Sequence, residues 1–222
     1  MFVKICANTN LADAQLAVEA GADAVGFVFA KSTRQMTAAQ VAVITPHLPD
    51  SVKKIGVFHA RTAEEIIHDV HGAGLTGAQL HFAYDPEVVA RLREEFGAEF
   101  FLIQTLHWVV DGDADAAERS FREQLRAVAK AQGVDAILLD AKTAEASGGT
   151  GQSFDWARAR RVLDEESVTL AVILAGGLKP ENVGEAIAAL RPWGVDVASG
   201  VEYTPGMKDA GKVLEFVKAA RG

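Results

Sequence analysis

A (β/α)8 barrel made by one domain, residues 1–222, is the fold that this sequence predicts from three observations. Short apolar runs alternate with longer amphipathic or alanine-rich stretches along the whole chain. The alternation occurs eight times, which is the number of strand and helix units that closes a parallel barrel. No linker, low-complexity tract or block of charge divides the chain into separate parts.

The expected strands are short runs that are rich in β-branched and apolar residues. They cover residues 2–6, 24–29, 54–58, 78–81, 100–105, 136–140, 169–174 and 195–199. The expected helices cover residues 11–20, 38–45, 63–70, 86–96, 115–131, 154–163, 180–190 and 210–220. Strict alternation requires right-handed crossovers, so neighbouring strands should lie parallel.

Local chemistry marks several helix ends. Asn10 is a typical N-cap residue, and Thr62 with Glu65 three residues later forms a capping-box pattern. Pro180 suits a first helical turn. Glycine is expected to close three of the helices, at Gly21, Gly97 and Gly133.

An open doubly wound sheet is the competing architecture. It would be favoured by a Gly-x-Gly-x-x-Gly pattern after the first strand, where Asn8-Thr9-Asn10 stands instead. The longest irregular stretch, residues 107–114, is expected to be either an active-site loop or a surface insertion.

The overall charge excludes some functions. A net charge of -8 and a pI near 5.3 argue against a general surface for nucleic acid or anionic membranes. A small anion is still allowed, because backbone N–H groups can bind phosphate. No segment approaches the roughly 20 apolar residues of a membrane span, and no signal peptide is apparent, so we expect a cytoplasmic protein.

Cys6 is the only cysteine, so no internal disulfide can form, which agrees with a reducing compartment. The sequence contains no CxxC or HxxxH pattern and no clustered His and Asp residues. We therefore expect no metal.

Chemistry is expected where the strands end, because the C-terminal ends of barrel strands form the ligand face. The apolar run 137–139 ends in Asp140 and is followed by the glycine-rich segment 148–151 and the start of a helix. A half-desolvated carboxyl group at this place suits proton transfer. The alternative is that Asp140 only caps a turn.

Cys6 ends the first strand. A thiol, with a pKa of about 8.5, can act as a base where its surroundings favour the thiolate, although most such cysteines are only small buried hydrophobes. We expect Lys4 on the other face of the strand, so loop amides would have to stabilise the thiolate. Arg34, after the second strand, either pairs with a ligand carboxylate or is a solvated charge.

Glycines follow the last two strands. Gly176-Gly177 and Ser199-Gly200 place bare N–H groups at the expected mouth, next to a helix that should begin near Pro180 or Glu181. Such a helix end and its neighbouring amides typically bind phosphate, although an isolated Gly-Gly is often a simple turn.

The order and spacing of many short motifs resemble the phosphoribosylanthranilate isomerase family of tryptophan biosynthesis over nearly the whole chain. The matching segments are 4–6 with Thr9, 21–27, Ser32 with Arg34, 79–81, 139–140, 148–151, 154–156, 175–178, Pro180 with 182–183, 194–197, 199–202, and 205–206 with 208–209. The resemblance implies a barrel of the ribulose-phosphate-binding type and an Amadori rearrangement of N-(5-phosphoribosyl)anthranilate without a cofactor.

The resemblance also implies roles for single residues. Asp140 would be the general acid that opens the ribose ring, and Cys6 the general base that removes the C2 proton. The other implied contacts are Arg34 for the anthranilate carboxylate, Gln79 and His81 for the pocket floor, Asp196 for a ribose hydroxyl, and Gly176, Gly177, Ser199 and Gly200 for the phosphate. The partner would be this small phosphosugar, with no nucleic acid or membrane, and the chain would be a monomer or a homodimer.

Four positions depart from the family pattern. Ala7 and Phe82 stand where glycine is usual, Ala198 replaces a serine, and His59-Ala60-Arg61 stands where asparagine is expected. If Ala7 has a positive φ, it costs roughly 1 kcal/mol. These departures bear on substrate affinity.

Two other functions are weaker alternatives. A phosphoribosyl isomerase of histidine biosynthesis would resemble this chain, but it uses aspartates after the first and fifth strands, where Cys6 and Thr105 stand. A catalytically silent phosphosugar-binding barrel is opposed by the presence of both Cys6 and Asp140.

Overall fold

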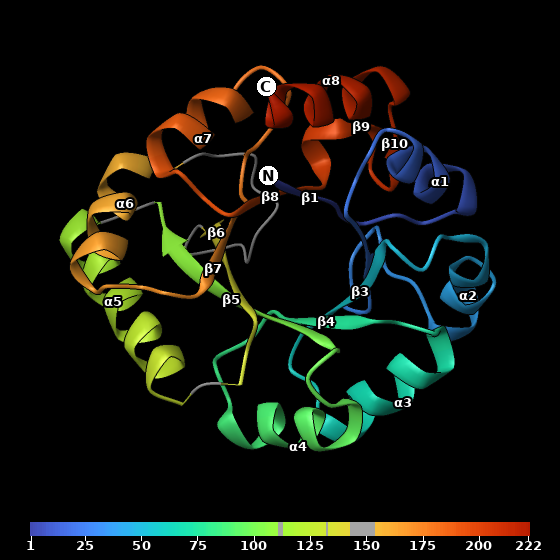
Figure 1. The fold of residues 1–222 in the computed structure, drawn as a ribbon, viewed down its shortest axis with the longest axis horizontal. Coiled ribbons are helices and arrows are strands. Elements are labelled where there is room, and N and C mark those ends of the chain that lie inside the picture. Colours follow the sequence, from blue (N-terminus) through green and yellow to red (C-terminus); the bar gives the residue numbers. More distant parts are fainter. Residues whose placement is uncertain (111–112, 132, 143–153) are drawn as a thin grey trace.

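The computed structural model describes residues 1–222 except 111–112, 132 and 143–153. Eight parallel strands close a barrel in the order β1 to β8, and the helices form a ring around it (Figure 1). This confirms the predicted fold class. The strands are β1 Phe2–Ile5, β2 Ala24–Val28, β3 Lys53–Phe58, β4 Gly77–Leu80, β5 Phe101–Val109, β6 Ala136–Lys142, β7 Ala171–Leu174 and β8 Gly194–Val197.

The helices follow the strands in the predicted order. They are α1 Leu11–Glu19, α2 Ala38–Ala42, α3 Ala63–Ala73, α4 Pro86–Phe96, α5 Ala114–Ala131, α6 Trp156–Glu165, α7 Val183–Leu190 and α8 Ala210–Arg221. Asn10 accepts the expected N-cap hydrogen bond from the Asp13 N–H, and Thr62 with Glu65 forms the capping box. No helix in the described part of the chain is long and apolar enough to cross a membrane.

Several predicted boundaries are wrong, and two of them lie next to the ligand face. The strand expected to end at residue 105 continues as β5 to Val109, because its extra residues pair with β6, His107 against Asp140 and Val109 against Lys142. The helix expected to begin at Pro180 begins at Val183 after Asn182, whose side chain bonds the Lys179 N–H and the Gly177 carbonyl instead.

The barrel interior has two layers. Its lower part is apolar and includes Ile55, Ile103 and Leu138. The ring of Phe2 stacks on Trp193 at a centroid distance of 4.6 Å and lies near Phe101, so aromatic rings cover the N-terminal ends of the strands. The upper part is polar, and this change of character places the chemistry at the C-terminal ends.

A short antiparallel pair follows β8. β9, Glu202–Thr204, and β10, Met207–Lys208, connect the barrel mouth to α8. The hairpin returns the buried Glu202 and Lys208 side chains toward the ligand face of the barrel.

Candidate active site

One cavity of about 250 Å³ lies at the C-terminal ends of the strands. All ten residues that the sequence suggested for the site line it. They are Cys6, Arg34, Gln79, His81, Asp140, Gly176, Gly177, Asp196, Ser199 and Gly200. The strand-end rule and the family resemblance together indicated residues that are spread over almost the whole sequence.

The backbone turns sharply after β1. The Cys6 N–H donates to the Val197 carbonyl at 2.8 Å, and the next residue, Ala7, is buried with a φ of 61°. The Asn8 side chain donates to the Ile5 carbonyl at 2.8 Å and closes the turn. Ala7 therefore has the positive φ that glycine tolerates better, and its left-handed conformation costs about 1 kcal/mol.

Lys4 lies inside the barrel, which corrects the expectation that it lies on the other face. Its side chain is fully buried, and Nζ donates to Asp196 Oδ1 and to Gln79 Oε1, both at 3.0 Å. The reason is the two-residue period of a strand, which sends the side chains of Lys4 and Cys6 to the same side. The sequence analysis missed that Lys4 lies next to Cys6, although this period could have shown it.

The thiol of Cys6 is in an unfavourable place for a negative charge. Burial raises its pKa above the ordinary value, and the carboxylate of Asp196 raises it further. The positive charge of Lys4 and a side-chain hydrogen bond from Lys4 lower this pKa and offset part of the increase. The thiolate is thus accessible mainly because a buried cation lies next to it.

Asp140 points into the same cavity from β6. Leu138, two residues earlier, belongs to the apolar barrel interior, so the strand alternation places the carboxyl group inside as well. Burial, and next the charge of Asp196, raise the pKa of Asp140 from 3.8 to about 7, although the Ala141 N–H and Lys4 oppose the change. A carboxyl group with this pKa keeps its proton for part of the time at neutral pH, as a general acid requires.

Arg34 reaches the cavity with its guanidinium held by Glu202. Nε lies 2.9 Å from Glu202 Oε1, and Nη2 lies 2.6 Å from Oε2. The same carboxylate accepts a hydrogen bond from the buried Lys208 Nζ at 3.3 Å. Glu202 fixes the direction of Arg34, and no local sequence signal could have paired two residues that lie 168 positions apart.

Glycine lines the side of the cavity next to β7 and β8. Gly176 and Gly177 have positive φ values of 82° and 66°, and a Cβ on Gly176 would lie 2.9 Å from Asp140 Oδ1. Neither N–H donates a backbone hydrogen bond to another residue in the described part of the chain. A side chain on Gly200 would overlap the Leu178 carbonyl. This rim leaves room and donors for an anion.

Three histidine rings lie next to one another at the ends of neighbouring strands: His59 follows β3, His81 follows β4, and His107 belongs to β5. The ring of His81 stacks on His59 at 4.2 Å between centroids and lies 4.8 Å from the ring of His107. Burial lowers the pKa of His59, so this imidazole is neutral at physiological pH. His59 is a departure from the family pattern that lines the cavity, a place that its sequence position alone did not reveal.

Two histidines and an aspartate that are far apart in the sequence cluster in the folded barrel. Ligand atoms of His81, His107 and Asp140 lie within 4.8 Å of one another, because β4, β5 and β6 are neighbours in the barrel. Residue types of this kind could hold a divalent cation. The prediction that the protein uses no metal stays a prediction.

The remaining departures affect the site less directly. Ala198 lines the cavity and its carbonyl accepts a hydrogen bond from Lys208 at 3.2 Å. Phe82 lines a second cavity, which shares His81 with the first and contains Tyr84 and His107. The glycine-rich segment 148–151 lies outside the described residues.

Comparison with known proteins gives one consistent result. The family model described as N-(5'phosphoribosyl)anthranilate (PRA) isomerase matches residues 3–219. The N-(5'-phosphoribosyl)anthranilate isomerase of Chlorobaculum tepidum is 40% identical over 99% of this chain and 94% of its own length.

Solved structures of that enzyme have the same fold. The phosphoribosyl anthranilate isomerase of Thermotoga maritima superposes with a TM-score of 0.85 at 37% identity, covering 100% of this chain and 99% of its own. A second structure, a complex with reduced 1-(o-carboxyphenylamino)-1-deoxyribulose 5-phosphate, has a TM-score of 0.81 at 35% identity, with coverage of 100% and 99%.

Proposed function

The chain belongs to the N-(5'-phosphoribosyl)anthranilate isomerase family, and from this premise we propose that Asp140 and Cys6 perform its Amadori rearrangement as acid and base. The substrate is N-(5'-phosphoribosyl)anthranilate, and the product is 1-(2-carboxyphenylamino)-1-deoxyribulose 5-phosphate. The observation that carries the assignment is the single cavity that both side chains line, from β1 and from β6.

Asp140 and Cys6 carry out one proton transfer each, and a tautomerisation completes the reaction. The Asp140 carboxyl group gives its proton to the ribose ring oxygen, the bond from this oxygen to C1 breaks, and a Schiff base forms between C1 and the anthranilate nitrogen. The Cys6 thiolate then removes the C2 proton, the C1–C2 bond becomes double, and the nitrogen receives the electron pair. The resulting enolamine tautomerises to the ketone, so no atom is gained or lost and no redox partner is needed.

Binding residues surround this pair. Arg34, directed by Glu202, holds the anthranilate carboxylate with its guanidinium, which suits planar bidentate recognition. Asp196 accepts a hydrogen bond from a ribose hydroxyl, and Gln79 and His81 form the floor. The phosphate occupies the rim of Gly176, Gly177, Ser199 and Gly200, where small residues allow the backbone to approach the ligand.

Replacing the two proton-transfer groups tests the proposal. Cys6→Ala and Asp140→Asn should each lower kcat by at least about 10³-fold, because each removes one obligatory proton transfer. The assay follows the fluorescence decay of freshly made phosphoribosylanthranilate. Full activity of either variant, or failure of the wild-type protein to convert this substrate, would contradict the mechanism.

A stability measurement shows whether the inactive protein is folded. The raised pKa of Asp140 means that this carboxyl group destabilises the folded state once the pH exceeds the ordinary value near 4. Asp140→Asn should therefore have a higher Tm than the wild type at pH 7 while it is inactive. A Tm below the assay temperature would indicate that the loss of activity reflects unfolding.

The other functions have less support. Thr105 cannot replace an aspartate as an acid, and its hydroxyl accepts a hydrogen bond from Gln79 at 3.1 Å. A silent phosphosugar-binding barrel would not need the raised pKa of Asp140. We further propose a cytoplasmic protein without cofactor or nucleic-acid partner, acting as a monomer or homodimer, a choice that sedimentation velocity can decide.

A further inference from the structure

The buried ammonium of Lys4 lies where it can act on the catalytic thiol. Asp196 on β8 and Gln79 on β4 hold it from two sides at 3.0 Å, and the Gln79 amide is itself held by Thr105 on β5 at 3.1 Å. Side chains of β4, β5 and β8 thus fix the charge of Lys4 in the barrel interior. The Lys4 ammonium neither gives nor takes a proton in the proposed mechanism.

Gly26 provides the space in which the ammonium and the sulfur meet. A Cβ at this position of β2 would lie 2.6 Å from Cys6 Sγ and 3.2 Å from Lys4 Nζ. Both polar atoms therefore lie in the volume that a side chain here would occupy. The φ of Gly26 is not in the left-handed region, so the glycine is required for space and not for backbone conformation.

The charges that face Cys6 come from four elements. Lys4 on β1 makes the largest favourable contribution to the thiolate, Asp196 on β8 opposes it, and Lys208 on β10 adds a smaller favourable one. Arg34, after β2, also faces the sulfur. Lys208 and Arg34 are both bonded to Glu202, just as Lys4 is bonded to Asp196, so charge pairing does not distinguish the three cations. Of the three, Lys4 is the one that also hydrogen-bonds the thiol and meets it at Gly26. Lys4 is thus the cation best placed to stabilise the thiolate.

We propose that Lys4 is a positioning residue of the isomerase reaction, whose ammonium, held by Asp196 and Gln79, stabilises the thiolate of Cys6 across the gap at Gly26. The proposal rests on the proposed function, in which Cys6 is the base. Without Lys4, the thiolate would lose its nearest cation and would face an Asp196 carboxylate that forms no other ion pair within the described residues.

The single cysteine allows a direct test that needs no substrate. The rate of Cys6 alkylation by iodoacetamide, followed by mass spectrometry from pH 6 to 10.5, gives the thiol pKa. Lys4→Met should raise this pKa by at least about one unit, which leaves about tenfold less thiolate at pH 8. In the isomerase assay kcat should fall by about the same factor, and the limb of the pH profile assigned to the thiol should move to higher pH.

Two further variants separate this role from a structural one. Lys54→Met removes another buried lysine, whose Nζ donates to the Pro49 carbonyl at 2.9 Å, and it should leave the thiol pKa and kcat unchanged. Gly26→Ala keeps the charge, but its methyl group would lie 2.6 Å from Cys6 Sγ, 3.1 Å from Cys6 Cα and 3.2 Å from Lys4 Nζ. It should therefore displace the sulfur from the ammonium and change the thiol pKa and kcat in the same direction as Lys4→Met. It also serves if Lys4→Met does not fold.

An unchanged thiol pKa in folded Lys4→Met, or in Gly26→Ala if only that variant folds, would overturn the proposal. So would a loss of activity that lies only in KM. Failure of the wild-type protein to isomerise phosphoribosylanthranilate would instead overturn the proposed function, because the alkylation experiment does not depend on turnover.

Discussion

Cys6 must be deprotonated and Asp140 must be protonated when they act. The surroundings of the two groups make this combination a minor form of the enzyme. The base must be a thiolate, yet burial raises the pKa of Cys6 above its ordinary value. The acid must carry its proton, and the pKa of Asp140 is about 7. The active form is therefore a small fraction of the enzyme, and this fraction stays constant between the two pKa values. A cation next to Cys6 matters because it increases this fraction.

This arrangement predicts the pH dependence of the reaction. The value of kcat/KM should rise with pH up to about 7, stay level, and fall only above the thiol pKa. Below pH 7, a rise in pH increases the fraction of Cys6 that is thiolate while most Asp140 stays protonated. Above pH 7, the thiolate fraction still rises, but the protonated fraction of Asp140 falls by the same factor, so the rate stays level. The measurement is kcat/KM from pH 5 to 10.5, with the alkylation pKa of Cys6 assigning the upper limb. A profile that falls between pH 6 and 8 would contradict these pKa values.

Ala7 carries backbone strain at the edge of the active site. Its φ of 61° is favourable for glycine and costs an alanine about 1 kcal/mol, a cost that outweighs the entropy lost when glycine is ordered. Ala7→Gly should increase the free energy of unfolding by about 0.5–1 kcal/mol in urea titrations. Ala17→Gly, inside α1, is the control and should decrease it. A less stable Ala7→Gly variant would show that the turn tolerates alanine without strain.

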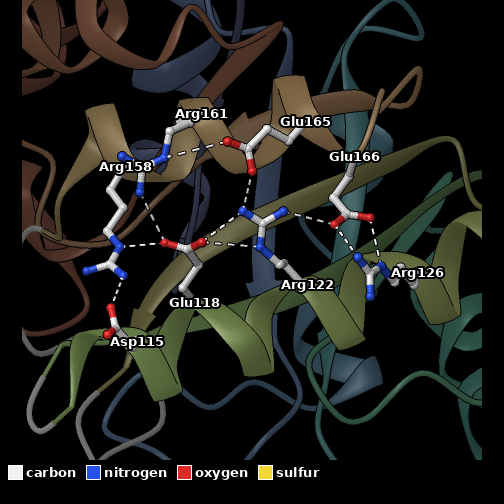
Figure 2. Close-up of polar contacts among 8 residues, drawn as sticks. All are labelled: Asp115, Glu118, Arg122, Arg126, Arg158, Arg161, Glu165 and Glu166. Atoms are coloured by element: carbon white, nitrogen blue, oxygen red, sulfur yellow. Dashed lines mark hydrogen bonds and ion pairs between the residues drawn. The ribbon is translucent and has the colours of Figure 1, made fainter.

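Helices α5 and α6 are joined by a network of arginines and carboxylates (Figure 2). Glu118 of α5 accepts hydrogen bonds from Arg122 at 2.8 Å, from Arg158 of α6 at 2.6 Å and from Arg161 at 3.3 Å. Arg122 also bonds Glu165 and Glu166 at the end of α6. The network fixes α6, the helix that follows the segment after β6, against its neighbour.

Removing the central carboxylate should weaken this connection. Hydrogen bonds from Arg122 and then Arg158 lower the pKa of Glu118 from 4.5 to about 2. Because the folded-state pKa is lowered, the stabilisation exists above pH 4.5 and is lost as the pH falls toward 2. Glu118→Gln should therefore decrease the free energy of unfolding by about 1 kcal/mol at pH 7 and low salt.

The difference from the wild type should shrink with added salt and on acidification from pH 4.5 to 2. Glu19→Gln, an exposed position on α1, is the matched control and should change Tm little. Equal Tm values for Glu118→Gln and the wild type at pH 7 would mean that the network contributes no net stability.

The closed barrel accounts for our proposal that residues 1–222 form one domain. β1 pairs with both β2 and β8, so the first and last thirds of the chain share one sheet. Packing in the barrel interior likewise joins residues of β2, β3, β5, β6 and β7 in one apolar cluster. No strand of such a sheet can unfold without opening the closed barrel.

One domain predicts one cooperative unfolding transition. Trp193 lies at the N-terminal ends of the strands, whereas Trp108 packs beside Phe121 of α5 at 5.2 Å. Their fluorescence and the far-UV circular dichroism should give the same midpoint in urea, since they report on distant parts of one unit. Trp193→Phe removes the signal of Trp193 and leaves those of Trp108 and of the third tryptophan, Trp156 at the start of α6. Two midpoints would divide the chain into independently unfolding parts.

The sequence by itself determined the eight strand and helix units. The rule that chemistry lies where barrel strands end indicated Cys6, Asp140 and the glycines after the last two strands, and the family resemblance supplied Gln79, His81 and Asp196. These properties depend on local periodicity and chain order, which the sequence contains. Its errors were local too: residues 107–109 joined β5 because β6 lay beside them, and Asn182, not Pro180, preceded α7 because its side chain bonded nearby backbone groups.

Only the tertiary structure decided which distant side chains meet. Closure of the barrel brings Asp196 to Lys4, the hairpin after β8 brings Glu202 to Arg34, and neighbouring strands bring His107 to Asp140. Charge pairing and desolvation act over a few ångströms of space, whatever the separation along the chain. The protonation of Cys6 and Asp140 is therefore a property of the folded barrel.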